Sequence, residues 1–135
     1  MEVLFIPQMQ ASNICQHLNN NVWKSYAHDL SKAPLKSEGI YAIGFRQLVP
    51  LGVEVLYVGR SMDIHRRLQQ HKCQNQAIDK FVKEQFALNG GINLCIKWVE
   101  VQNSTCLEGK YLNCMSAKLG YWPRFNLQHG NTCNY

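Results

Sequence analysis

The chain has 135 residues, of which 46% are hydrophobic and 17% are charged. This length suits one domain with a single core, and the apolar content excludes a disordered or fibrous chain. No apolar run approaches the roughly 20 residues that a membrane-spanning helix needs. The N-terminal segment has no basic start and reaches Pro7 after a short apolar run, so we expect no signal peptide and no membrane partner.

Six cysteines stand at positions 15, 73, 95, 106, 114 and 133, and no two of them form a C-x2-C pair. This spacing argues against a zinc knuckle or ribbon. The chain has enough apolar residues to fold without a disulfide framework, and no secretory signal is predicted. We therefore expect free thiols in an intracellular protein, cytoplasmic or nuclear, with Cys95 and Cys114 in the core.

The net charge is +5, and most of it falls within residues 60–83. That window holds six basic side chains and two acidic ones, which gives +4. Most such clusters are a solvated helix face. The cluster could also form a phosphate-binding face, and charge alone favours the first interpretation.

The N-terminal part is predicted to be a helical lead-in packed on the domain. Apolar residues recur at three- and four-residue spacing from Val22 to Leu30. The periodicity predicts a helix that ends near Lys32, because Pro34 follows it.

Two strands are predicted next, over residues 39–45 and 53–59, joined by a hairpin loop over residues 46–52. Alternate residues share a face of each strand. The expected sets are Tyr41, Ile43 and Phe45 in the first strand, and Val53, Val55 and Tyr57 in the second.

The second half alternates helices with one strand. A helix is expected after residues 61–63, with Asp63 as a favourable charge at its start, and another after Asn75 that ends at residues 90–91. A third strand is predicted over residues 92–101 and a last helix over residues 105–119. The result is a small α+β domain with a central antiparallel sheet of about three strands and flanking helices.

Two tyrosine motifs occupy the predicted hairpin strands, Gly39–Ile40–Tyr41 and Tyr57–Val58–Gly59. Arg67 and His71 follow four residues apart, on one face of the next helix. Glu108 opens the last helix, and Asn126 follows it. In this order the motifs resemble the GIY-YIG nuclease superfamily, over roughly residues 38–127. Val58 replaces the usual isoleucine, and the longer gap between Tyr41 and Tyr57 leaves the subfamily unresolved.

The resemblance divides the chain into an N-terminal helical extension over residues 1–37, a GIY-YIG-like nuclease domain over residues 38–127 and a polar tail over residues 128–135. It implies a general base at Tyr41 and a metal ligand at Glu108. His71 resembles the family's histidine-or-tyrosine partner of the arginine, and Asn126 its C-terminal asparagine.

The residue chemistry agrees with hydrolysis of a phosphodiester, which needs a base, positive charge near the phosphate and a metal or proton for the leaving oxygen. Arg67 offers a fork of donors, and Arg60 offers a second cation. Both would favour a tyrosine phenolate, and His71 could accept or relay its proton. Tyr57 would bind the phosphate or a water. A single carboxylate at Glu108 suits Mg²⁺ (or Mn²⁺) in a one-metal mechanism.

Each candidate also has a structural interpretation. Strand tyrosines are often half-buried, and a basic helix face is usually solvated. Thr105-x-x-Glu108 can form a capping box, and Asn126 can be a turn residue. Singly, each structural interpretation is favoured. The ordered pattern reverses this for Tyr41, Tyr57, Arg67 and Glu108.

We therefore expect a metal-dependent endonuclease that hydrolyses DNA, duplex or branched. The first alternative is a catalytically inactive nucleic-acid-binding module on the same fold. A weaker alternative is a structural domain that binds an acidic protein through its basic face. The sequence leaves open the specificity for one DNA site or structure, the use of RNA, the biological pathway and a homodimer.

Overall fold

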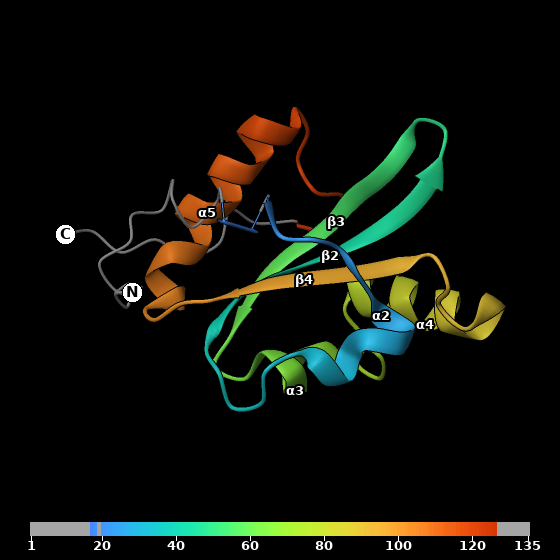
Figure 1. Ribbon diagram of the computed structural model, residues 1–135, viewed down its shortest axis with the longest axis horizontal. Coiled ribbons are helices and arrows are strands. Elements are labelled where there is room, and N and C mark those ends of the chain that lie inside the picture. The colour runs from blue at the N-terminus through green and yellow to red at the C-terminus, as the bar shows by residue number, and fades with distance from the viewer. Residues whose placement is uncertain (1–16, 19, 127–135) are drawn as a thin grey trace.

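The computed structural model describes residues 17–18 and 20–126. In chain order its elements are β1 (Lys24–Ser25), α2 (Tyr26–Asp29), the 3₁₀ helix η2 (Leu30–Lys32), β2 (Gly39–Leu48), β3 (Leu51–Ser61), α3 (Ile64–Gln70), α4 (Ala77–Asn89), β4 (Leu94–Glu100) and α5 (Ser104–Leu119). The four strands form one antiparallel sheet in the order β1-β4-β2-β3. Helix α5 lies on one face of the sheet, and α2, α3 and α4 lie on the other (Figure 1). The α+β class is confirmed.

Each face of the sheet carries its own buried cluster, because successive strand residues point to opposite faces. The first cluster lies under α2, α3 and α4 and includes Tyr26, Tyr41, Ile43, Ile64, Leu68, Ile78, Val82, Leu94 and Ile96. The second lies under α5 and includes Ile40, Ala42, Val55, Val58, Tyr111, Leu112 and Met115.

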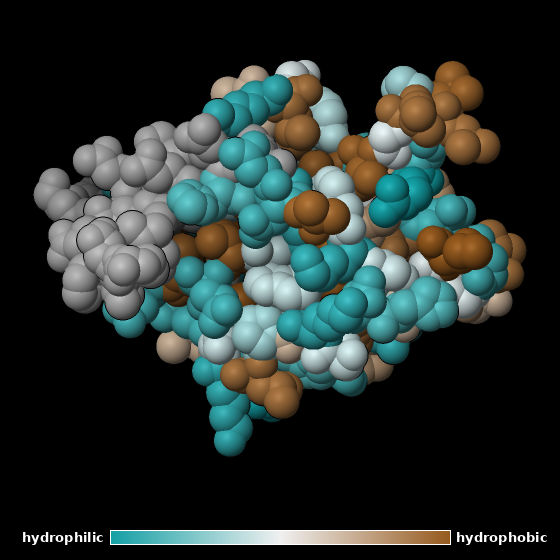
Figure 2. Space-filling model, in the orientation of Figure 1, coloured by the Kyte–Doolittle hydropathy of each residue, from teal (hydrophilic) through white to brown (hydrophobic). Residues whose placement is uncertain are grey.

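The β2–β3 hairpin is longer than the sequence predicts. Pairing continues to Leu48 and Leu51, which leaves Val49 and Pro50 as a two-residue turn. The predicted loop over residues 46–52 is wrong, because residues 46–48 lie in β2 and residues 51–52 lie in β3. The exposed tip carries apolar side chains at Leu48, Val49 and Leu51, and it stands away from the body of the domain (Figure 2).

A β-bulge in β3 decides which way its tyrosine points. The register shifts between Ile43 and Gly44, so that Tyr57 pairs with Ile43 and Leu56 has no partner. Tyr57 packs on the cluster that contains Tyr41, whereas Val55 belongs to the cluster under α5. The predicted common face for Val53, Val55 and Tyr57 is therefore wrong, because the bulge moves Tyr57 to the other side.

The N-terminal prediction is wrong in its extent. Instead of one helix over residues 22–32, β1 pairs with β4 and is followed by α2 and η2. Ser25 explains the change, because its side chain accepts the backbone N–H of His28 and starts the helix there. The added strand makes the sheet four-stranded rather than three-stranded. Residues 1–16 and 19 of the predicted extension, and the whole predicted tail over residues 128–135, lie outside the described residues.

The predicted ends of the other helices agree with the structure. Asp63 caps α3 by accepting the Arg66 backbone N–H at 3.1 Å. Gly90 and Gly120 end α4 and α5 with φ angles of 73° and 81°, a left-handed conformation that favours glycine. Across residues 17–18 and 20–126, no helix has both the length and the apolar character needed to cross a membrane.

The cysteines do not all behave as predicted. Cys73 and Cys95 are free thiols, and Cys95 is buried in the core as expected. Cys106 and Cys114 each take part in a disulfide, so the expectation of six free thiols is wrong. Since disulfides are rare in reducing compartments, the thiol argument for an intracellular location no longer holds.

Candidate active site

Three aromatic rings from separate elements converge on the face covered by α3 and α4. Tyr41 comes from the middle sheet strand β2, Tyr57 from the bulged edge strand β3, and His71 from the C-terminal end of α3. Ring centroids lie 5.6 Å apart for Tyr41 and His71, 5.4 Å for Tyr57 and His71, and 6.2 Å for the two tyrosines. The structure therefore brings these three predicted site residues together.

A chain of hydrogen bonds runs inward from the first tyrosine. The Tyr41 hydroxyl lies 2.6 Å from His71 Nε2, and His71 Nδ1 lies 2.5 Å from Asp79 Oδ1. The second carboxylate oxygen, Oδ2, accepts the backbone N–H of Gln76 at 2.9 Å. Tyr41, His71 and Asp79 have no exposed side-chain surface. This chain links β2 to the N-terminal turn of α4.

Asp79 is the residue that sequence reasoning missed. In the sequence it is one of the two acidic residues within the basic window over residues 60–83. Its one sequence signal is its place three residues after Gln76, where a carboxylate can accept the N–H at a helix start. Nothing in that pattern indicates that the other oxygen meets His71, because α3 and α4 are joined by a loop of unpredictable path.

Arg67 lies beside both phenols, where its hydrogen bonds and charge lower the pKa of Tyr41 and of Tyr57. Its guanidinium also donates to Gln74 Oε1 at 2.9 Å and, at longer range, to Gln70 and Gln76. The side chain is half-buried. It therefore presents a fixed fork of donors between the buried phenol and solvent.

Burial outweighs Arg67 in setting the charge of the phenols. Loss of hydration raises the pKa of Tyr41 well above its usual value of 10.0, and it also raises the pKa of Tyr57. The expectation that Arg60 and Arg67 favour a phenolate is met for Arg67, in direction only, and is not met for Arg60. Burial also lowers the pKa of His71 despite its hydrogen bond to Asp79, so the imidazole is neutral at neutral pH.

Glu108 lies on α5, at the margin of this cluster. Its carboxylate contributes to the raised pKa of Tyr57, which places the two groups within electrostatic range. The predicted capping box is wrong, because the helix already begins at Ser104 and Thr105 lies inside it. Ser104 is instead held by Glu38, which accepts from its backbone N–H at 2.8 Å and from its hydroxyl at 2.6 Å.

The donor chemistry at Glu108 fits a magnesium ion. The side chain is half-buried, and among the described residues its carboxylate makes no hydrogen bond or salt bridge. No group of three His, Cys, Asp or Glu side chains suited to a metal occurs in the described part of the chain. A single hard carboxylate with room for water and phosphate oxygens is a usual Mg²⁺ arrangement.

Arg60 is not brought into the tyrosine cluster. It pairs with Ile40, whose side chain is buried under α5, and its Nε donates to Ser104 Oγ at 2.9 Å. The predicted second cation thus lies on the α5 side of the sheet. There its hydrogen bond joins β3 to the first turn of α5. Glu108 lies on the next turn of the same helix.

Asn126 holds the free edge of β3. Its Oδ1 accepts the Val58 N–H and its Nδ2 donates to the Val58 carbonyl, both at 2.8 Å. The Phe125 N–H donates to the Leu56 carbonyl at 2.9 Å. These hydrogen bonds hold β3 on both sides of Tyr57. The side chain of Asn126 therefore bonds to the backbone and positions this tyrosine.

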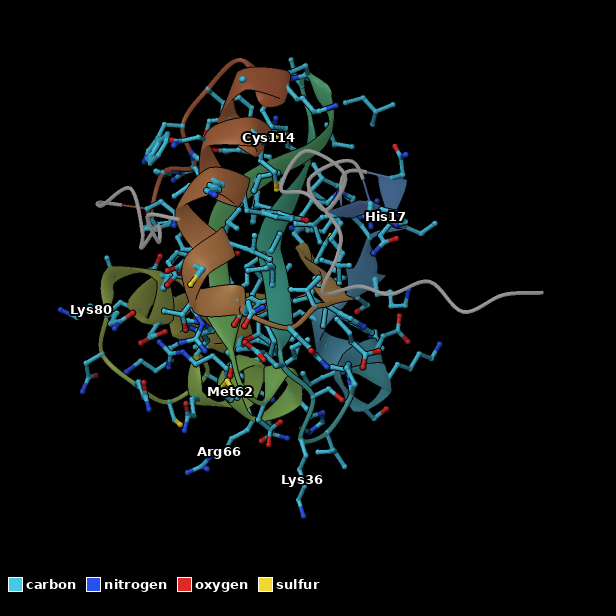
Figure 3. The ribbon with its side chains drawn as sticks, turned by 90° about the vertical axis from the view of Figure 1, so that its left-hand side faces the viewer. His17, Lys36, Met62, Arg66, Lys80 and Cys114 are labelled. Carbon is cyan, nitrogen blue, oxygen red and sulfur yellow. The ribbon has the colours of Figure 1, made fainter. Side chains whose placement is uncertain are left out.

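Exposed basic side chains lie on several elements of the domain. In Figure 3, Lys36 and Arg66 extend from the lower end of the molecule and Lys80 extends from its left side. Lys72 is also exposed and lies 4.8 Å from the ring centroid of Phe86. Exposed positive charge is therefore present on α3, on α4 and in the segments before β2 and after α3.

Comparison of the chain with protein-family models, with curated proteins and with solved structures gave no significant match.

Proposed function

We propose that this chain is a metal-dependent endonuclease that hydrolyses phosphodiester bonds in DNA, as a GIY-YIG-like nuclease would. The observation that carries the proposal is the convergence of Tyr41, Tyr57, Arg67 and His71 in one cluster, with Glu108 at its margin. These residues are separated by up to 67 positions in the chain, yet they were selected from the sequence for the same reaction. Independent structural roles give no reason for that convergence.

Arg67 is the phosphate-binding group in this proposal. It is half-buried, its guanidinium is oriented by glutamine side chains, and it reaches both phenols. A phosphate bound to its fork comes next to the Tyr41 hydroxyl. A donor already in place for the charge that develops on the phosphate lowers the barrier without reorganisation.

Tyr41 and His71 provide the general base as a pair. A phenolate is costly at this buried position, so Tyr41 does not ionise in advance. Instead, the water gives a proton to Tyr41 Oη as the phenol gives its own proton to His71 Nε2. The hydroxide attacks phosphorus, the bond to the leaving oxygen breaks, and that oxygen takes a proton from solvent. The imidazolium then returns its proton through the same path.

Glu108 would hold the metal ion, with waters and phosphate oxygens as the other ligands. When bound, Mg²⁺ or Mn²⁺ would neutralise charge on the phosphate and polarise it toward attack. Arg60 and Ser104 orient the first turn of α5 and so set the place of this carboxylate. The exposed Lys36, Arg66 and Lys80 would contact DNA phosphates on either side of the cleavage point.

The second candidate is a DNA-binding module on the same fold that does not cut. Full burial of Tyr41 favours it, because a base must reach the water that it activates. Both candidates predict DNA affinity that falls steeply with salt, since lysine and arginine contacts release counterions. If the basic face instead binds an acidic protein, we expect the chain to have little affinity for a DNA duplex.

The test is incubation of the purified chain with supercoiled plasmid and with branched DNA, with Mg²⁺, with Mn²⁺ and with EDTA. We expect nicked or linear products only with metal, and none from the Arg67→Ala variant. Binding of the same DNA, measured in parallel, separates the candidates. Tight salt-sensitive binding without any cleavage would support the non-cutting module, and failure to bind would reject both.

A further inference from the structure

A positioning role for Asp79 follows from the hydrogen-bond chain beneath Tyr41. We propose that Asp79 holds His71 in the tautomer protonated at Nδ1, which leaves Nε2 free to accept the Tyr41 proton. The proton transfer from Tyr41 to His71, which this tautomer makes possible, rests on the proposed function. The tautomer itself does not, because it follows from the contacts between Asp79 and its two partners.

The contacts allow one arrangement of protons. Asp79 Oδ2 already accepts the Gln76 N–H, and a carboxylate oxygen can only accept, so His71 Nδ1 must carry the hydrogen in the 2.5 Å contact. A neutral imidazole with a proton on Nδ1 has a lone pair on Nε2. The Tyr41 hydroxyl, 2.6 Å away, is therefore the donor to Nε2.

Within residues 17–18 and 20–126, the surroundings of His71 provide no competing hydrogen-bond partner for its ring nitrogens. The groups that face it are Tyr41 from β2, Tyr57 from β3, Arg67 from α3 and Asp79 from α4. Arg67 disfavours a charged imidazole, whereas Asp79 favours it, and both His71 and Asp79 are fully buried. When the phenol proton reaches Nε2, the imidazolium forms against the carboxylate, which stabilises the new charge.

Asp79→Asn is the informative substitution because it keeps size and helix-start geometry. The asparagine oxygen can still accept the Gln76 N–H, but its NH₂ group then donates to His71 Nδ1 and moves the imidazole proton to Nε2. Nε2–H can no longer accept from Tyr41. Asp63→Asn is the matched control, since Asp63 also bonds the backbone at a helix start but makes no hydrogen bond to a histidine among the described residues.

The first measurement is nitrogen NMR of the histidine rings, with His71 assigned by its loss in His71→Gln. We expect wild-type His71 to be protonated at Nδ1 with a downfield proton signal, and Asp79→Asn to lose that signal and become protonated at Nε2. Asp63→Asn should leave both unchanged. Wild-type protonation at Nε2 would overturn the proposal, even if Asp79→Asn does not fold.

The second measurement is DNA cleavage by the same proteins. We expect Asp79→Asn to lose at least about 10²-fold in turnover with DNA affinity unchanged, and Asp63→Asn to lose less than about 2-fold. In the His71→Gln background, Asp79→Asn should cost nothing more, because Asp79 acts through that ring. Normal turnover in an Nε2-protonated variant would overturn the positioning role. If the wild type does not cut, the proposed function fails, and NMR still decides the tautomer.

Discussion

The Tyr41 hydroxyl lies against the α-carbon of Gly59, its partner across the β2–β3 pair. A Cβ built on Gly59 would stand 2.6 Å from Tyr41 Oη and 2.7 Å from a carbon of the Tyr57 ring. No side chain fits there. The glycine of the second motif is therefore needed for space, because it lets two tyrosines pack on one face of neighbouring strands.

Gly59→Ala should disturb both the packing and the reaction. We expect a loss of about 1–3 kcal/mol in the free energy of unfolding, because the rings must move to admit a methyl group. Denaturant unfolding and DNA cleavage check this together. Gly90→Ala is the control: it has a left-handed φ of 73° but open space around its Cα, so it should lose stability and keep its turnover. Equal cleavage by both variants would contradict the role given to Gly59.

Tyr41→Phe tests the base and also has a stability cost that the sequence did not indicate. The ring remains, but the buried Nε2 of His71 loses its donor, so we expect a loss of about 1–3 kcal/mol in stability. Turnover should fall by about 10² to 10⁴ while DNA affinity persists. Tyr57→Phe is the comparison variant. If Tyr41→Phe retains half of wild-type turnover and Tyr57→Phe does not, the base is Tyr57.

Glu108→Gln tests the metal ligand without changing size. Its carboxylate makes no hydrogen bond or salt bridge within the described residues, so we expect the stability to stay within about 0.5 kcal/mol of the wild type. Magnesium-dependent cleavage should be lost. Glu54→Gln is the control, because Glu54 lies on β3 rather than α5 and forms a surface salt bridge with Arg124 at 2.9 Å. Undiminished cleavage by Glu108→Gln, or by the wild type in EDTA, would remove the metal from the proposal.

Arg67→Lys keeps the charge but loses the planar fork. A lysine ammonium cannot serve both phenols and a phosphate in the geometry that the guanidinium has. We expect turnover to fall by about 10²-fold or more, with DNA affinity changed by less than about 3-fold. Arg124→Lys, at a surface salt bridge with Glu54, is the control and should change neither. A small, equal loss in rate and affinity for Arg67→Lys would make it an ordinary phosphate contact.

Much of the fold was readable because periodicity and end signals agreed. Gly90, Gly120 and Asp63 marked helix ends that the structure reproduces, since each has a local backbone reason. The segment around Ser25 could not be read this way. Its helical spacing was real, but pairing of β1 with β4 is a tertiary contact that overrides local propensity.

The site was predictable where residues share one rigid element and less so elsewhere. Arg67 and His71 had to lie on one face of α3, and Tyr41 had to face the same side as Phe45. The convergence of Tyr57 depended on a bulge at Leu56, which has no signature in the sequence. The prediction that placed Arg60 with the tyrosines is wrong because paired strand residues share a face. Arg60 pairs with Ile40, whose side chain is buried under α5.

The pH dependence of stability tests the buried state of His71. Its pKa is lowered in the folded protein, so between that value and the ordinary 6.5 the unfolded chain binds a proton that the folded protein does not. The unfolding free energy should therefore be full above about pH 6.5 and should fall as the pH is lowered below it. Asp29 and Asp63 also have lowered pKa values, but they act in the same direction only near and below pH 4.

His71→Gln should flatten this slope below about pH 6.5, as measured by denaturant unfolding at each pH. His28→Gln, at an exposed position of α2, is the matched control and should keep the wild-type slope. Cleavage should follow the same titration, because only a neutral His71 can accept the Tyr41 proton. Turnover should reach a plateau above about pH 6.5 rather than rise through the neutral range, since the buried phenol does not ionise there. A rate that climbs steadily from pH 7 to 9 would instead point to a free phenolate and would assign the base to the more exposed Tyr57.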